Sequence, residues 1–239
     1  MSQPSRSQII HLAGGCFWGV EEYFSRIGGV LSVTSGYANG STANPSYQEV
    51  CTGTTNHAET VRVEFDPQLI SLASLINQFF KIINPFSLNR QGNDVGTQYR
   101  TGIYYSTEQQ RLVAEGYVQR YQQLSGGRQV RVEIRPLQSF YPAEDYHQHY
   151  LRKHPTGYCH ISFSSLDRIE RLNDADFVPG AMGGGNEATS QGDAEEAAGR
   201  ARPAGGSAHP QVRCPVLSSA VVASVAAVDL DEFGDEQQC

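Results

Sequence analysis

Most of the chain lacks an excess of charge of either sign. Residues 1–171 carry 15 basic and 14 acidic side chains, whereas residues 172–239 carry 3 and 11, so the net charge of −7 belongs almost wholly to the C-terminal part. A nucleic-acid-binding domain needs a basic field that neutralises phosphates. The composition therefore excludes a nucleic acid as the expected partner of residues 1–171.

Closely spaced cysteines are also missing. The five cysteines are Cys16, Cys51, Cys159, Cys214 and Cys239, and no Cys-x-x-Cys pair occurs. An odd number at wide spacing argues against a disulfide framework, and zinc sites usually need closer ligands. We therefore predict thiols that stay reduced, no metal and no cofactor. Such thiols are typical of a reducing compartment, so we expect a cytoplasmic protein.

Long apolar runs are absent as well. The one apolar run of the C-terminal part, residues 216–228, is broken by serines and is too short to cross a bilayer. Cys16 follows the start too closely for a signal peptide, so neither secretion nor a membrane is predicted. Residues 172–239 are rich in Ala, Gly and acidic residues without periodicity, which predicts a disordered tail behind a domain of residues 1–171. No exposed interaction stripe is evident, and we expect a monomer.

Hydrophobic periodicity is clear in residues 1–171. Alternation predicts the strands, and spacings of three and four predict the helices. Residues 38–56 and 84–100 are long polar loops, which are commonly functional. The fold class expected from this order is α+β: a two-layer sandwich with a mixed, mainly antiparallel sheet, packed helices and a ferredoxin-like core. Strands are expected at residues 8–13, 30–37, 58–65, 101–105 and 130–134, and helices at 16–27, 69–83, 107–124 and 165–172.

The run GGCFWGVE at residues 14–21 lies where a predicted strand turns through glycines into a helix. The first turn of a helix carries unpaired N–H groups and partial positive charge, which stabilise a thiolate. Cys16 is therefore a candidate nucleophile, against the alternative of a small buried hydrophobe. Phe17 and Trp18 are equally consistent with core packing and with an apolar pocket beside the thiol.

Other candidates carry weaker signals. Glu59 begins a strand and, on the residues alone, fits a solvated carboxylate better than a catalytic acid. Tyr47 and Tyr99 lie in the two long loops, where a phenol could bind a substrate oxygen. If Cys16 were oxidised to a sulfenic acid, Cys159 is the natural thiol to condense with it.

Two other classes of function remain open on these residues. A cysteine hydrolase would pair Cys16 with His57 or His147 and would need no second thiol. A redox-sensing binding module would oxidise Cys16 and change its contacts with a partner. The histidines are scattered, and no two of them form a convincing metal site with a third ligand.

Several blocks together resemble the A-type peptide-methionine sulfoxide reductases. They occur in the family's order across residues 8–165, and the chain from residue 172 lies outside the resemblance. Independent blocks in one order make a chance match implausible. The blocks are GGCFWGVE at 14–21, NPSYQEVC at 44–51, HAE at 57–59, NRQGNDVGTQYR at 89–100, AEDYHQ at 143–148 and PTGYC at 155–159.

The resemblance implies a role for each candidate in reduction of the sulfoxide. Cys16 would attack the sulfur of methionine sulfoxide, while Glu59 would protonate its oxygen and Tyr47 and Tyr99 would hold that oxygen. A neutral carboxyl group near an apolar wall suits this step, so we predict an upward-shifted pKa for Glu59. Cys16 would be left as a sulfenic acid, which Cys159 would resolve to a disulfide that thioredoxin reduces.

The substrates implied are oxidised proteins and peptides, and also free methionine sulfoxide. Phe17 and Trp18 would form the pocket for the S-methyl group that selects the S epimer, and Asp94 would help bind the substrate backbone. The chain departs from the better-known pattern after Cys159, where HISF replaces a glycine-rich end with a further cysteine. We therefore expect a two-cysteine cycle, with a relay through Cys214 or Cys239 as an open alternative.

Overall fold

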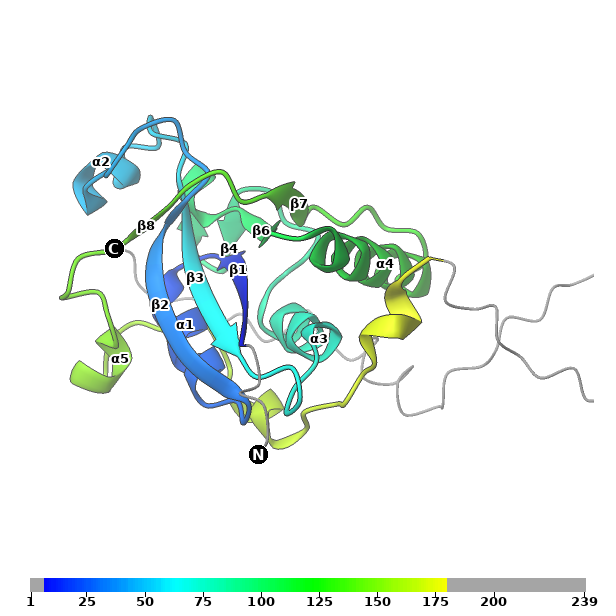
Figure 1. Cartoon of the computed structure of the whole chain (residues 1–239). Helices are drawn as coiled ribbons and strands as arrows, with labels where there is room; N and C mark the ends of the chain where they lie inside the picture. The colour runs from blue at the N-terminus through cyan, green and yellow to red at the C-terminus, as the bar shows by residue number, and fades with distance from the viewer. Residues whose placement is uncertain (1–6, 180–239) are drawn as a thin grey trace, which may run out of the picture.

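A computed structural model of the protein describes residues 7–179. Its main sheet has the strand order β7-β6-β1-β3-β2-β8, and only the β6–β7 pair is parallel. The predicted mixed, mainly antiparallel sheet is therefore confirmed (Figure 1). The strands are β1 (Gln8–Gly14), β2 (Val30–Ala38), β3 (Ala58–Phe65), β6 (Thr101–Tyr105), β7 (Glu133–Pro136) and β8 (Phe140–Pro142), and β4 (Arg90–Gln91) pairs with β5 (Asp94–Val95) in a separate small hairpin.

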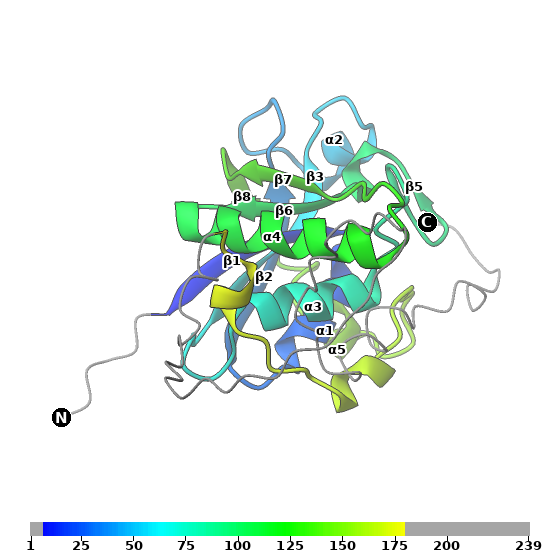
Figure 2. The ribbon, with the colours of Figure 1, turned by 90° about the vertical axis from the view of Figure 1, so that its right-hand side faces the viewer.

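Helices connect and cover these strands. Helix α1 links β1 to β2, and α3 links β3 to the β4–β5 hairpin. Helices α3 and α4 lie side by side in both ribbon views (Figures 1 and 2). The helices are α1 (Phe17–Ser25), α2 (Tyr47–Cys51), α3 (Leu72–Ile82), α4 (Glu108–Leu124) and α5 (Tyr150–Lys153), with 3-10 turns η1 (Thr97–Tyr99), η2 (Ser164–Asp167) and η3 (Asp174–Phe177).

The core lies between the sheet and the helices. Central strand β3 buries most of its side chains on both faces, and the apolar stripe of α3 packs against the same core. Ser71 caps α3 and Thr107 caps α4, each accepting a hydrogen bond from the backbone N–H three residues on. Thr107 was the predicted cap of that helix.

The strand register brings four chain segments to one edge of the sheet. Because β1 runs antiparallel to β3 and β6, the end of β1 at Gly14 lies beside the starts of both neighbours. The end of β2 at Ala38 pairs with the start of β3 at Ala58. The segments that leave β1 and β2 or enter β3 and β6 therefore meet at this edge, and they contain Cys16, Tyr47, Glu59 and Tyr99.

Some expected elements differ in position or were missed. The strand expected at residues 130–134 begins at Glu133, and the loop of residues 38–56 contains the unpredicted helix α2. Strand β8 is also an element that the sequence does not predict. The helix expected at 165–172 is only the short turn η2, and the turn η3 follows beyond that range. The ferredoxin-like core and the two-layer description stay predictions.

The tail that the composition predicts to be disordered lies mostly outside the described residues, which end at residue 179. Residues 172–179, which were assigned to that tail, contact α3 and α4 through hydrogen bonds and ring packing. No helix within residues 7–179 is both long and apolar enough to cross a membrane.

Candidate active site

Cys16 lies in the predicted turn between β1 and α1. It is the N-cap residue of α1 and is only 8% exposed. Gly15 has a φ of 84°, and a Cβ atom there would lie 2.6 Å from Cβ of Gln91. Only glycine fits this left-handed position without displacing Gln91, so the glycine before Cys16 is required by the turn.

Glu59 lies next to the start of α1. Its side chain is 2% exposed on β3, and its carboxylate accepts a hydrogen bond from the backbone N–H of Phe17 at 3.1 Å. Burial raises the pKa of Glu59 to about 8, the negative charge of Asp94 adds to the shift, and the Phe17 N–H opposes it. This is the direction expected from the sequence, and at neutral pH the carboxyl group is mostly protonated.

Tyr47 and Tyr99 come from two different segments and both lie within the electrostatic reach of Glu59. Tyr47 is the first residue of α2 and Tyr99 the last of η1. Burial raises the pKa of both phenols, and the charge of Glu59 raises it further; Cys16 has the same effect on Tyr99. Both phenols therefore keep their protons and can donate hydrogen bonds near Glu59. The Cys51 thiol is in hydrogen-bond contact with Tyr47.

Phe17 and Trp18 form an aromatic wall beside Cys16. Their ring centroids are 6.5 Å apart, and the Trp18 indole stacks on Tyr150 at 3.8 Å with planes 12° apart. The indole N–H donates to Nδ1 of His147 at 3.0 Å, and the buried His147 ring also contacts Phe17 and Tyr47. Two contacts thus fix Trp18. Sequence reasoning assigned no such role to His147 or Tyr150, because both lie more than 120 residues away.

The histidines that a hydrolase would use are engaged elsewhere. His57 accepts a hydrogen bond from the Gly40 N–H at Nδ1, at 3.1 Å, while its Nε2 lies 2.8 Å from the Thr42 carbonyl oxygen. His147 accepts a hydrogen bond from the Trp18 indole N–H at Nδ1, and its buried Nε2 has no hydrogen-bond partner of ordinary geometry within residues 7–179. His57 is therefore held by the loop after β2, and this arrangement does not favour a cysteine–histidine hydrolase.

Cys159 lies against the first turn of α1. A Cβ atom on Gly19 would be 3.0 Å from Sγ of Cys159, so the absence of a side chain at Gly19 allows this approach. The thiol donates to the carbonyl oxygen of Ile161 at 3.6 Å, and burial raises the pKa of Cys159. The Cys159 thiol therefore lies beside Gly19, which follows Cys16 by three positions in the chain.

Asp94 lies on the β4–β5 hairpin. Its Oδ2 accepts a hydrogen bond from the Tyr158 hydroxyl at 3.4 Å, and burial raises the pKa of Asp94. Its charge acts on both Glu59 and Tyr99, so it belongs to the same neighbourhood. Within residues 7–179, no group of three or more His, Cys, Asp or Glu side chains is arranged to hold a metal ion.

Comparison with known proteins decides the family. The model of the family "Peptide methionine sulfoxide reductase" matches residues 8–176. The chain belongs to the peptide methionine sulfoxide reductase family. It is thus an oxidoreductase, and the resemblance seen in the sequence is confirmed.

Named relatives agree with this assignment. MsrA of Clostridium botulinum strain Hall is 54% identical over 153 residues, which cover 64% of this chain and 96% of that protein. MsrA of Ureaplasma urealyticum is 46% identical over 155 residues, covering 65% and 93%. Methionine sulfoxide reductase A of Corynebacterium diphtheriae is a solved structure that is 40% identical, with a TM-score of 0.61, covering 66% of this chain and 79% of that one.

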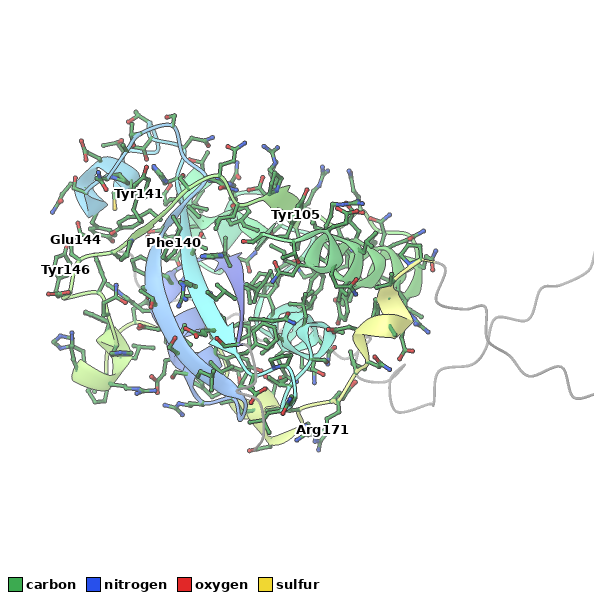
Figure 3. All side chains as sticks on the ribbon, in the orientation of Figure 1. Tyr105, Phe140, Tyr141, Glu144, Tyr146 and Arg171 are labelled. Atoms are coloured by element: carbon green, nitrogen blue, oxygen red, sulfur yellow. The ribbon has the colours of Figure 1, made fainter. Side chains whose placement is uncertain are left out.

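Glu144 is a residue of this reductase that the sequence did not single out. One carboxylate oxygen accepts from the Tyr37 hydroxyl at 2.7 Å, and the other accepts from the backbone N–H of Tyr47 at 2.9 Å. Glu144 therefore ties α2, and with it the Tyr47 phenol, to β2. Figure 3 shows Glu144 and Tyr146 together on the segment between β8 and α5. Glu144 lies in the block AEDYHQ, which is part of the family resemblance, but the spacing of that block does not indicate what Glu144 contacts.

Proposed function

We propose that this reductase converts the S epimer of methionine sulfoxide, in proteins and as the free amino acid, to methionine. The observation that carries the proposal is the buried carboxyl group of Glu59, held 3.1 Å from the backbone N–H that follows Cys16. A sulfoxide is a poor electrophile until its oxygen is protonated, and Glu59 retains a proton at neutral pH. The proposed acid and the proposed nucleophile therefore both lie next to the start of α1.

The first step transfers oxygen from substrate to enzyme. The sulfur of Cys16 attacks the sulfoxide sulfur, Glu59 supplies a proton to the oxygen, and Tyr47 and Tyr99 hold that oxygen by hydrogen bonds. Methionine leaves as the thioether while Cys16 becomes a sulfenic acid, so the sulfoxide is reduced by two electrons and the cysteine is oxidised by two. Asp94 binds the substrate backbone.

Epimer selection follows from the placement of the aromatic wall. Phe17 and Trp18 form the pocket for the S-methyl group, and the oxygen must at the same time face Glu59. The site then fixes three directions around the chiral sulfur: that of the methyl group, that of the oxygen and that from which the thiol attacks. Only one epimer can satisfy all three and react. His147 and Tyr150 support this by fixing the Trp18 ring.

The second step regenerates the thiol. Cys159 condenses with the sulfenic acid of Cys16, forming a disulfide and releasing water, and a dithiol reductant of the thioredoxin class reduces it. The position of Cys159 against Gly19 supports this two-cysteine cycle. We further propose a cytoplasmic role in repair of oxidised proteins, with residues 1–171 as the catalytic domain, a monomeric enzyme and no cofactor.

The test is methionine formation from each sulfoxide epimer, with and without thioredoxin. We expect turnover of the S epimer only. A Cys159→Ser variant should release about one methionine per enzyme in the first turnover and then lose thioredoxin-driven recycling. Equal turnover of both epimers would contradict the pocket assignment, and full recycling by Cys159→Ser would contradict the two-cysteine cycle.

A further inference from the structure

The imidazole of His160 is a buried polar group that the proposed chemistry does not use. Its side chain is 5% exposed, and its one hydrogen-bond contact within residues 7–179, a loose one with the Gly14 backbone, falls outside ordinary geometry. Burial lowers the pKa of His160 to about 4, so the ring is neutral at physiological pH. Burying a polar ring with so weak a partner costs free energy. This histidine therefore calls for an explanation in terms of its position.

The His160 ring lies between the turn that carries Cys16 and the hairpin that carries Asp94. A Cβ atom on Gly15 would lie 3.3 Å from Nε2, and one on Gly92 would lie 3.4 Å from the Cβ of His160. Nδ1 is 3.7 Å from Oδ2 of Asp94. The ring thus fills the space between two segments of the active site, and both present glycines toward it.

The neighbours of His160 hold the same chain segment from other directions. The Tyr158 hydroxyl donates to Asp94 at 3.4 Å, which attaches the segment to the hairpin. Cys159 and Ile161 both lie against Gly19, each with an atom 3.0 Å from where its Cβ would be. Residues 158–161 therefore bridge the β4–β5 hairpin and the first turn of α1, and the Cys159 thiol lies at the α1 end of this bridge.

We infer that His160 is a positioning residue for the recycling step, holding the Cys159 thiol beside the catalytic turn. This inference rests on the proposed function. In that step the sulfur of Cys159 attacks the sulfenic sulfur of Cys16. The S–S bond forms, the S–O bond breaks, and the oxygen leaves as water with the hydroxyl proton and the thiol proton. His160 acts in this step through the placement of its own segment.

The experiment follows one turnover of His160→Ala on the S sulfoxide without reductant. Rapid quenching measures methionine, the Cys16–Cys159 disulfide and the Cys16 sulfenic acid trapped by a 1,3-dicarbonyl probe. We expect methionine to form within about twofold of the wild-type rate. Disulfide formation should slow by roughly tenfold or more, because a small misplacement of a reacting group is costly, and trapped sulfenic acid should rise accordingly.

Three further variants sharpen the result. His160→Phe keeps a ring of similar size and gives up only the loose contact with the Gly14 backbone, so it should retain fast disulfide formation. Ser162→Ala changes an exposed neighbour and should match the wild type. His160→Asn, a smaller polar replacement, should slow the disulfide like His160→Ala, and it decides the question if the alanine variant does not fold.

Two results would overturn the positioning role. One is a wild-type rate of disulfide formation in both small-residue variants. The other is a methionine burst that slows as much as the disulfide step, which would place His160 in support of the substrate site through Asp94. Failure of the proposed function looks different: the wild-type protein itself would form no methionine, or no Cys16–Cys159 disulfide.

Discussion

Burial is the main reason that the Glu59 carboxyl group keeps its proton at neutral pH. Its side chain is buried on the central strand β3, and this burial raises its pKa. The hydrogen bond from the Phe17 N–H lowers the pKa, but by less than burial raises it. The charge of Asp94 acts in the same direction as burial. The surroundings of Glu59 therefore keep it protonated. A substitution that keeps the shape of the side chain but removes the acidic proton tests what that proton contributes.

Glu59→Gln should slow the first turnover strongly. The amide has nearly the same size and can still accept from the Phe17 N–H, but it cannot give its proton to the sulfoxide oxygen. General acids contribute about 10²- to 10⁴-fold, so we expect a loss of that order in a rapid-quench measurement of methionine. Glu64→Gln, on the same strand but bonded to Ser7 and Ser32, is the matched control. A loss below about threefold in Glu59→Gln would rule out this acid.

The pH dependence of the wild-type first turnover should carry the same signature. Because the protonated form of Glu59 is the active one, the rate should fall as pH rises through about 8. Glu59→Gln should lack this particular decline, whatever its residual rate. A single-turnover pH profile of both proteins measures the difference, and a wild-type decline that persists unchanged in the variant would assign it to another group.

The stability of the folded protein should depend on pH in the same direction as the rate. The folded-state pKa of Glu59 is about 8, above its ordinary value of 4.5, so the unfolded chain loses this proton first. The free energy of unfolding should therefore fall between pH 4.5 and 8 and level off above, by on the order of 5 kcal/mol at most from this group. Chemical denaturation at pH 5 and pH 8 should show a smaller fall for Glu59→Gln than for wild type.

At the level of elements, length decides what the sequence can predict. Helices α3 and α4 repeat their apolar positions over several turns, and both were predicted. Helix α2 has only five residues, too few to show a period, although the block Ser46-x-x-Glu49 is a capping box that marks its start. Strand β8 is three residues long and was missed for the same reason.

The residues of the candidate site also differ in how well a local sequence pattern predicts them. Cys16 was found from its local setting, since glycines and a helix start are visible in the sequence. The role of Glu59 was inferred only from the resemblance, because its burial depends on α1 packing across β3. The contacts of Trp18 with His147 and Tyr150 join residues from opposite ends of the domain, and no local pattern reports them.

The cap of α2 offers a test at this scale. The Ser46 side chain accepts from the Glu49 N–H, and the Glu49 carboxylate accepts from the Ser46 N–H at 2.8 Å. Ser46→Ala should cost about 1 kcal/mol and loosen the helix that carries Tyr47, raising KM for the sulfoxide several-fold. Thr107→Ala removes the cap of α4 instead and should lower stability similarly without changing KM. Equal KM changes in both variants would contradict a local role for α2.

For the whole molecule, the C-terminal side of the domain depends on contacts that composition does not reveal. Asp174 accepts from the backbone N–H of Ala73 at 2.7 Å, which satisfies a donor in the first turn of α3. Leu172 donates to Ser74 and accepts from Ser71. The change in composition at residue 172 is real, yet single residues beyond it complete a helix a hundred positions earlier.

Gly116 tests how tightly this C-terminal segment is bound to α4. A Cβ atom on Gly116 would lie 1.8 Å from the carbonyl oxygen of Phe177, so Gly116→Ala must displace η3, although alanine favours the helix by about 1 kcal/mol. We expect faster hydrogen exchange at residues 72–74 and 172–179 and a net loss of about 1–3 kcal/mol in stability, with methionine formation unchanged. Gly28→Ala, which meets no atom within 4 Å, is the control. If hydrogen exchange were unchanged in Gly116→Ala and its stability rose, the packing of η3 on Gly116 would not contribute to stability.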